Sequence, residues 1–204
     1  MISIIGSGGH SISLINNFFK YKDISVIYDL CTPKKNEKIH GIKVEKFDIK
    51  KINKKEKLFI AIGDNILRKN IFYHLKKNNF IINNCISKKA KLIKPIIIKS
   101  GNSIFSNSYV GPKSKIGENN IINTGAIIEH DAEIGNNCNI NPGVIICGKV
   151  KIGNNVVVGA GSIILENTEI CSNVIIGAGS LINKSIKRIG LYYGSPAKFI
   201  RDAK

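Results

Sequence analysis

The chain has 204 residues and a formal net charge of +17. That length allows one or two domains with buried cores, and no stretch of the sequence has the ~20 apolar residues that span a bilayer. The first ten residues, MISIIGSGGH, lack the basic and long apolar segments of a secretory signal. Five cysteines without a CxxC pair predict reduced thiols and a cytoplasmic location.

The positive charge does not by itself predict nucleic-acid binding. Of the 31 basic residues 28 are lysine, and no aromatic side chains interleave the lysine runs as they do in a base-stacking platform. Residues 1–99 carry a net charge of +14, against +3 for residues 100–204. We therefore expect no nucleic-acid partner, and favour an anionic small molecule as ligand of the N-terminal half.

Residues 1–85 are predicted to form a small α/β domain, because short apolar runs alternate with helical patterns. In chain order we expect a strand with a glycine turn at 1–9, a helix at 11–20, a strand at 24–29, a strand with its loop at 58–65 and a helix at 66–79. This order predicts a small, Rossmann-like parallel sheet. The lysine-rich segments between the predicted elements, 33–38 and 50–57, are expected to be solvated loops.

Gly6-Ser7-Gly8-Gly9-His10 lies between the first predicted strand and helix, where backbone N–H groups can meet an anion. The dinucleotide-binding fingerprint is incomplete, because Ser11 stands where the third glycine would fall. A tight structural turn is the alternative interpretation, and His10 could simply cap it. A domain of about 90 residues has room for only half of a dinucleotide fold, which disfavours nicotinamide chemistry.

Two more residues are expected at the same edge of the predicted sheet. Asp29 ends the second predicted strand, and Gly63 follows the third. Open α/β sheets bind ligands at the carboxyl ends of their parallel strands. The sequence therefore predicts that both residues line one ligand site together with the glycine turn.

From residue 92 onward the apolar pattern has a period of six. Every sixth residue is aliphatic: Leu92, Ile98, Ile104, Val110, Ile116, Ile122, Ile128, Ile134, Ile140, Ile146, Ile152, Val158, Ile164, Ile170, Ile176 and Ile182. Neither an α-helix nor a hairpin has this period. It predicts that residues 86–204 form a β-helix of hexapeptide repeats, whose stacked coils bury the aliphatic ladder.

The triplet Glu129-His130-Asp131 interrupts only the outward positions of this ladder. His130 is the one histidine after residue 90, which argues against the three-histidine zinc site of some β-helix enzymes and against any catalytic metal. Imidazole is suited to take a proton at neutral pH, and a carboxylate on its other nitrogen would fix the tautomer. An exposed surface histidine is the alternative.

Four segments in this order, IIGSGGH, AIGDNILRKN, INTGAIIEHDAEIG and GSPAKFI, resemble the NeuD/PglD family of hexapeptide acyltransferases. These are sialic acid O-acetyltransferases and nucleotide-amino-sugar N-acetyltransferases. The resemblance implies a left-handed β-helix with three hexads per coil, acetyl-CoA as co-substrate and a homotrimer with sites between neighbouring β-helices. The implied activity is N-acetylation of a UDP-4-amino-sugar type of substrate for cell-surface glycans. Sugar O-acetylation, or an inert β-helix scaffold, are the alternatives.

The resemblance also implies roles for individual residues. His130 would be the general base and Asp131 its carboxylate partner, with Glu129 the weaker candidate for that role. Acetyl-CoA would be bound by Asn139, Gly148, Ala160, Ala178 and Lys198. The acceptor would be bound by Gly8, Gly9, His10, Asp29, Gly63 and Asn123. Asn139 departs from the family, which often has a second histidine there; because asparagine cannot carry a proton, a hydroxyl acceptor stays open.

Overall fold

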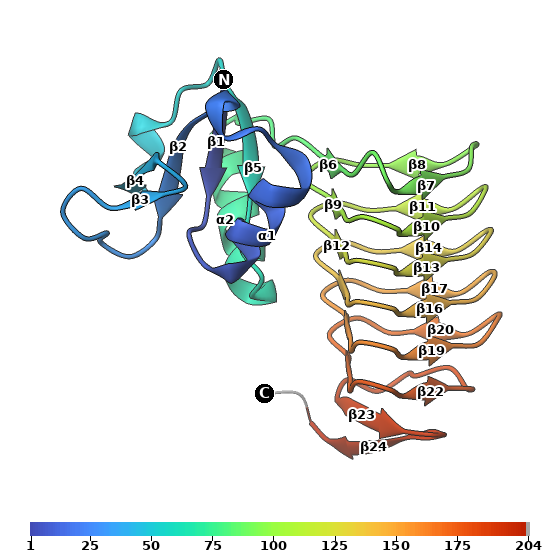
Figure 1. The fold of residues 1–204 in the computed structure, drawn as a ribbon. Helices are drawn as coiled ribbons and strands as arrows, with labels where there is room; N and C mark the ends of the chain where they lie inside the picture. Colours follow the sequence, from blue (N-terminus) through green and yellow to red (C-terminus); the bar gives the residue numbers. More distant parts are fainter. Residues whose placement is uncertain (203–204) are drawn as a thin grey trace. The chain divides into compact units, whose positions relative to one another are not determined.

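The computed structural model describes residues 1–202 and divides into two compact units, Met1–Cys85 and Ile86–Lys204 (Figure 1). The first unit is an α/β domain and the second a left-handed parallel β-helix, as the sequence predicts.

The first unit is built on a five-stranded sheet of order β3-β4-β2-β1-β5. Its elements are β1 (Ile2–Ile5), α1 (Gly9–Phe18), the 3-10 helix η1 (Tyr21–Asp23), β2 (Ile24–Asp29), β3 (Lys38–Ile39), β4 (Ile42–Lys46), the 3-10 helix η2 (Ile49–Lys51), β5 (Lys57–Ile60) and α2 (Asn65–Lys77). Strands β4, β2, β1 and β5 are parallel, and β3 forms an antiparallel hairpin with β4. The parallel order places the carboxyl ends of β2, β1 and β5 side by side.

Two features of this unit were not predicted. Strands β3 and β4 were not predicted because charged residues, Lys43 and Glu45, alternate in β4 with the buried Ile42 and Val44. The expectation that residues 50–57 form a solvated loop is wrong in part, since η2 extends into this segment and Ile52 is buried in the core.

The second unit consists of two-residue strands joined by short turns. They are β6 (Cys85–Ile86), β7 (Lys91–Leu92), β8 (Ile97–Ile98), β9 (Ser103–Ile104), β10 (Tyr109–Val110), β11 (Lys115–Ile116), β12 (Ile121–Ile122), β13 (Ile127–Ile128), β14 (Glu133–Ile134), β15 (Asn139–Ile140), β16 (Ile145–Ile146), β17 (Lys151–Ile152), β18 (Val157–Val158), β19 (Ile163–Ile164), β20 (Glu169–Ile170), β21 (Ile175–Ile176) and β22 (Leu181–Ile182), followed by β23 (Leu191–Gly194) and β24 (Ala197–Arg201). Figure 1 shows their coils stacked in chain order.

The strands form three faces, which we name by their first strands. The β7 face has six strands (β7, β10, β13, β16, β19, β22), the β8 face five (β8, β11, β14, β17, β20) and the β6 face eight (β6, β9, β12, β15, β18, β21, β23, β24). From β7 to β22, a residue on each face pairs with the one 18 positions later, as Ile128 does with Ile146. Three hexads therefore make one coil, as the resemblance implied.

The predicted aliphatic ladder is the core of this unit. From Ile104 to Ile182 every sixth residue is buried, whereas Leu92 and Ile98 are only partly buried because they belong to the first coil. Several turn glycines allow the coils to stack closely. At Gly117, for example, a Cβ would lie 2.4 Å from the carbonyl oxygen of Gly135, the residue one coil on.

Candidate functional site

Three turns meet at the carboxyl edge of the sheet in the first unit. Gly6, with φ of +114°, turns sharply after β1, and a Cβ on it would lie 2.5 Å from the carbonyl oxygen of Ala61. Gly8 is the N-cap of α1, and neither it nor Gly9 has an atom within 4 Å of where a Cβ would stand. The start of α1 is therefore open at the position where the sequence predicted an anion.

Asp29, at the end of β2, is joined to the glycine turn. Its Oδ2 accepts a hydrogen bond from the Ser7 hydroxyl, and its Oδ1 accepts one from the backbone N–H of Cys31 at 2.8 Å. Asp29 was expected at this edge, whereas no role was predicted for Ser7, although it lies between Gly6 and Gly8 of the glycine turn. The two hydrogen bonds fix the carboxylate beside the turn.

His10 and Gly63 also lie together, since a Cβ on Gly63 would be 3.6 Å from Cβ of His10. Arg68, a residue of α2 that is 1% exposed, donates hydrogen bonds to the carbonyl oxygens of Ile62 and Gly63 at 3.3 and 3.1 Å. Burial, with the nearby Arg68 charge, lowers the pKa of His10 to about 4, so its imidazole is neutral at pH 7. Sequence reasoning missed Arg68, one of three arginines in a lysine-rich chain.

In the second unit, His130 and Asp131 occupy the turn from β13 to β14. We call the series of turns from the β7 face to the β8 face the His130 edge. Asp131 has φ of +58°, and its Oδ2 lies 2.8 Å from Nδ1 of His130. The hydrogen bond from His130 lowers the pKa of the Asp131 carboxyl, and the charges of Lys113 and Lys149 act in the same direction. An ionised carboxylate only accepts hydrogen bonds, so Nδ1 carries the proton and Nε2 is left as the proton acceptor.

Gly148 lies against this imidazole, one coil further along the His130 edge. A Cβ on Gly148 would stand 2.7 Å from both Cε1 and Nε2 of His130. The missing side chain therefore leaves room for the imidazole, whose Cε1 and Nε2 pack against the backbone of Gly148. The neighbouring Cys147 is no competing nucleophile, because burial and the charges of Glu166 and Glu129 raise the pKa of its thiol.

The remaining predicted residues lie on other parts of the same β-helix. We call the series of turns from the β6 face to the β7 face the glycine edge; it carries Asn123, Ala160 and Ala178. The β6 face itself carries Asn139, in β15, and Lys198, in β24. Asn139 is nine residues, or half a coil, from His130. Within one chain the structure therefore brings His130, Asp131 and Gly148 together, and holds the other five on different sides of the prism.

Comparison with known families matches both units. The model of the PglD N-terminal domain matches residues 1–75, and that of the bacterial transferase hexapeptide (six repeats) matches residues 113–148 and 149–184. A solved perosamine N-acetyltransferase from Caulobacter crescentus, in complex with CoA and GDP-perosamine, is 26% identical, with a TM-score of 0.88 over 98% of this chain and 97% of its own. The chain thus has both domains of NeuD/PglD-type sugar acetyltransferases.

Two further solved structures show how far the similarity extends. The acetyltransferase domain of PglB from Neisseria gonorrhoeae shares the fold over 98% of both chains, with 23% identity and a TM-score of 0.88. AntD, an N-acyltransferase from Bacillus cereus, is 26% identical but covers 65% of this chain and 88% of its own, with a TM-score of 0.57. Among these three structures, the perosamine enzyme and PglB are similar to this chain along both units, whereas AntD is similar to only part of it.

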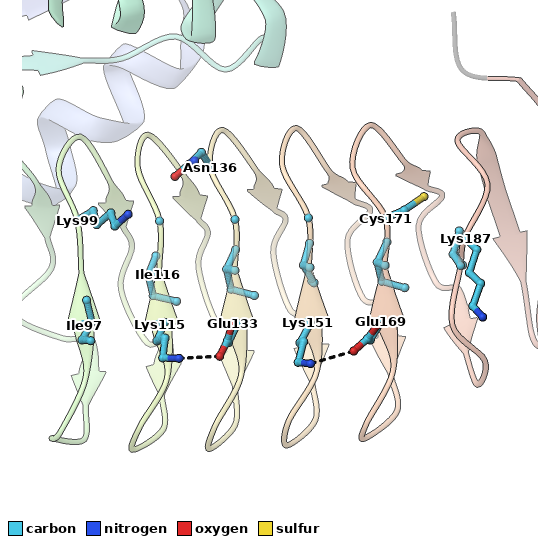
Figure 2. A pocket seen from close by; sticks show the side chains of 17 residues that line it. Ile97, Lys99, Lys115, Ile116, Glu133, Asn136, Lys151, Glu169, Cys171 and Lys187 are labelled. Atoms are coloured by element: carbon cyan, nitrogen blue, oxygen red, sulfur yellow. Dashed lines mark hydrogen bonds and ion pairs between the residues drawn. The ribbon is translucent and has the colours of Figure 1, made fainter.

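A cavity of about 670 Å³ lies on the β8 face of this NeuD/PglD-type chain, and His130 is not among the residues that line it. Figure 2 shows its ladder of charges, in which Lys115 pairs with Glu133 at 2.8 Å and Lys151 with Glu169 at 2.9 Å. These charges neutralise one another, and the cavity contains no histidine or other proton acceptor suited to neutral pH. The His130 edge, which carries an imidazole, is therefore the better candidate for the chemistry.

Residues 1–202 contain neither a candidate metal-binding group nor a candidate membrane-spanning helix. In this part of the chain no three His, Cys, Asp or Glu side chains are grouped closely enough to hold a metal ion. The helices within it are also too short or too polar to cross a bilayer.

Proposed function

We propose that the protein transfers the acetyl group of acetyl-CoA to the amino group of a nucleotide-linked sugar. The observation that carries this function is the His130–Asp131 pair, whose imidazole packs against Gly148, in a chain similar over 98% of its length to a sugar N-acetyltransferase. Nε2 removes a proton from the amine as its nitrogen bonds to the acetyl carbon. The carbon–sulfur bond then breaks, and the proton passes to the departing CoA thiolate.

The negative charge that develops on the thioester oxygen needs a hydrogen-bond donor. We assign this role to the backbone N–H of Gly148. No backbone acceptor within residues 1–202 takes up this N–H, and it lies beside the imidazole that receives the proton. Asp131 stabilises the imidazolium that forms, in the manner of a triad carboxylate.

A trimer would complete the site from two chains. The outward residues of the β7 face, which lies between the His130 edge and the glycine edge, form an aliphatic stripe: Ile127, Ile145, Ile163 and Leu181. Exposed apolar stripes of this kind mark association surfaces. Packing the β7 faces around a threefold axis would bring the glycine edge of one copy, with Asn123, Ala160 and Ala178, to the His130 edge of the next.

The first unit would hold the nucleotide part of the acceptor. The open start of α1 offers backbone N–H groups to the diphosphate. Asp29, fixed by Ser7 and Cys31, offers its carboxylate to sugar hydroxyls, and neutral His10 together with Gly63 would line the same edge. No disulfide joins the five cysteines within the described residues, and both substrates are cytoplasmic metabolites, so we place the reaction in the cytoplasm.

The test is a CoA-release assay with acetyl-CoA and a panel of acceptors. The panel contains UDP-, GDP- and dTDP-linked 4-amino sugars, their 4-hydroxy counterparts and free sialic acids. We expect turnover with a nucleotide-linked amino sugar and at least about 100-fold less with the hydroxyl counterpart. Turnover with sialic acid alone would assign the alternative O-acetyltransferase activity. Absence of CoA release with every acceptor would favour the scaffold interpretation.

A further inference from the structure

The sheet of the first unit has a second edge, opposite the carboxyl edge where Asp29 and Gly63 lie. Strands β4, β2, β1 and β5 all begin at this second edge, which we call the amino edge; in Figure 1 the letter N marks it. Helices α1 and α2 start at the carboxyl edge and lead back to chain that runs parallel to these strands, so both helices end at the amino edge. Three segments therefore meet there: residues 20–23 after α1, 53–57 around the start of β5, and 76–81 at the end of α2.

These three segments carry much more positive than negative charge. Their acids are Asp23 and Glu56, and their lysines, all exposed, are Lys20, Lys22, Lys54, Lys55, Lys57, Lys76 and Lys77. Seven lysines against two acids leave a net charge of +5. Glu56 is also turned toward the sheet, where its Oε2 accepts hydrogen bonds from the hydroxyls of Ser3 and Ser25. The amino edge thus presents mainly ammonium groups to the solvent.

The three segments form one continuous surface. Ile2 pairs with Ile24 on one side and with Lys57 on the other, so the chain enters β2 and β5 two strand spacings, about 10 Å, apart. Lys54 joins the loop before β5 to the end of α2, because its Nζ donates a hydrogen bond to the carbonyl oxygen of Asn78 at 3.2 Å. Lysines from distant parts of the sequence are therefore neighbours at this edge.

An apolar side chain lies among these lysines. Ile81 is 80% exposed, more than any other large apolar side chain that the structure describes. It lines an open cavity of about 230 Å³ together with Lys54, Lys55 and Lys57. A lone exposed isoleucine is common on protein surfaces, so its meaning depends on what surrounds and holds it.

The backbone on both sides of Ile81 is fixed. Its neighbours Phe80 and Ile82 are 9% and 2% exposed and belong to the core of the unit. The N–H of Phe80 donates a hydrogen bond to the carbonyl oxygen of Leu75 at 3.1 Å, and Ile82 pairs with Leu58 of β5. Because both neighbours are anchored, the side chain of Ile81 is held outward beside the ammonium groups.

This combination of groups fits an anionic lipid surface better than a nucleic acid. Ammonium groups are attracted to lipid phosphates, and an aliphatic side chain can enter the boundary between headgroups and acyl chains. A nucleic acid would favour free aromatic side chains for stacking. The aromatic residues of the three segments are Phe80, which is buried, and Tyr21, whose ring is stacked on His40 with 4.7 Å between the ring centres.

We infer that the amino edge docks the first unit onto a membrane that contains anionic lipids. The lysines lie among the headgroups, and Ile81 reaches below them. Because Asp29 and Gly63 are at the opposite edge of the same sheet, the ligand turns point away from the bilayer and stay accessible from the water. This inference does not depend on the proposed function, and it gives the protein a place at the membrane surface without a membrane-spanning helix.

The first test is cosedimentation with vesicles of phosphatidylcholine and phosphatidylglycerol in a ratio of roughly 2:1, compared with pure phosphatidylcholine. We expect binding to the mixed vesicles only, and weaker binding as the salt concentration rises. The triple variant Lys55→Gln/Lys57→Gln/Lys77→Gln should bind the mixed vesicles roughly 100-fold more weakly, since each lysine near an anionic surface strengthens binding about fivefold.

The matched control is Lys34→Gln/Lys35→Gln/Lys46→Gln. It removes the same charge from exposed lysines that follow β2 or end β4, toward the carboxyl edge, and should bind the mixed vesicles within about twofold of the wild type. Equal losses in the two triple variants would show only an effect of net charge and would overturn the inference. Failure of the wild type to bind the mixed vesicles would overturn it as well.

Ile81 provides a second, spectroscopic test, because the chain has no tryptophan. The emission of Ile81→Trp should shift to the blue when mixed vesicles are added, and lipids brominated on their acyl chains should quench it. Ile66→Trp is the matched control, since Ile66 is 68% exposed near the start of α2, at the carboxyl edge, and its replacement should stay in water.

Two results of the spectroscopic test would count against a membrane. An unshifted Ile81→Trp emission, or an equal shift at both positions, would contradict insertion at the amino edge. Duplex RNA that binds the wild type but not the lysine variant, with no shift in vesicles, would assign the amino edge to a nucleic acid instead. Neither measurement requires acetyl transfer, so failure of the proposed function would leave this inference intact.

Discussion

The imidazole of His130 rests on Gly148, the residue one coil further along the β-helix. A Cβ on Gly148 would stand 2.7 Å from Cε1 and Nε2, closer than two such atoms can approach without movement. The base and the backbone N–H assigned to the thioester oxygen are therefore fixed relative to one another by stacking of the coils. Their separation depends on a regular backbone, not on a flexible loop.

Gly148→Ala should move the imidazole away from its position. We expect kcat to fall by roughly 10-fold or more, because a 1 Å displacement of a reacting group can have such an effect. The cost in thermal stability should vanish when His130→Ala is introduced as well, since the methyl group then enters the space left by the ring. This double-mutant cycle, followed by thermal unfolding, tests the contact. Equal losses of stability in both backgrounds would show that the methyl group meets something other than His130.

His130→Ala should lower kcat by roughly two or more orders of magnitude, because it removes the imidazole that we propose as the general base. Asp131→Asn keeps the shape of the partner but removes its charge, and should also reduce kcat. CoA binding, measured by calorimetry, should survive in both variants. Near-normal turnover in His130→Ala would exclude it as the base.

Ile163→Glu should disrupt the trimer and reduce acetyl transfer, because it places a charge in the aliphatic stripe of the β7 face. Ile97→Glu is the matched control: Ile97 is 57% exposed on the β8 face and should tolerate the charge. Sedimentation equilibrium measures the mass of each variant. A trimeric Ile163→Glu protein would exclude the β7 face as the interface.

His10 should make the stability of the first unit depend on pH. Its pKa is lowered to about 4 in the folded state, whereas the unfolded chain has the ordinary value of 6.5. Between these values the unfolded state binds the extra proton, so the free energy of unfolding falls as pH is lowered from 6.5 to 4, by up to about 1.4 kcal/mol per pH unit. Chemical denaturation across this range measures the slope.

His10→Gln, which has no titrating group, is the control for this effect and should remove its share of the slope. Because Arg68 contributes to the lowered pKa, Arg68→Met should raise the pKa of His10 toward 6.5. Proton NMR titration of the imidazole would show the change directly. An unaltered slope in His10→Gln would mean that other groups cause the pH dependence.

The β-helix could be predicted well from the sequence because one position in each six-residue repeat carries an aliphatic residue that is buried in the core. Each aliphatic residue from Ile104 to Ile182 is buried for the same reason, contact with the equivalent residues of the coils on either side. Strand β4 was missed because its burial depends on β2, whose residues pair with residues of β4 that lie 17 positions later, and because Lys43 and Glu45 occupy its outward positions. Local pattern is a poor guide where charged residues alternate with only two buried ones.

The candidate site was predicted less completely than the fold. The His130–Asp131 contact joins neighbours in sequence, and the position of Gly148 follows from the 18-residue coil. Ser7 and Arg68 were missed because their roles depend on contacts with Asp29 and with the Gly63 loop, which only the folded sheet brings together. The six-residue period also does not predict that the turn containing Lys184 is shorter than the earlier ones, so that Ile170 pairs with Ile186, only 16 positions later.

The final hairpin also determines where the β-helix stops. A stack of parallel coils has an open row of N–H and C=O groups at its end, onto which another copy could add as the next coil. Here β24 runs antiparallel to β23, so the eight-stranded face ends in a strand of the opposite direction, with Lys198 and Arg201 exposed on it. An incoming parallel coil would meet mismatched hydrogen-bonding groups and positive charge. The hairpin thus protects a repetitive protein from growing end to end into a fibre.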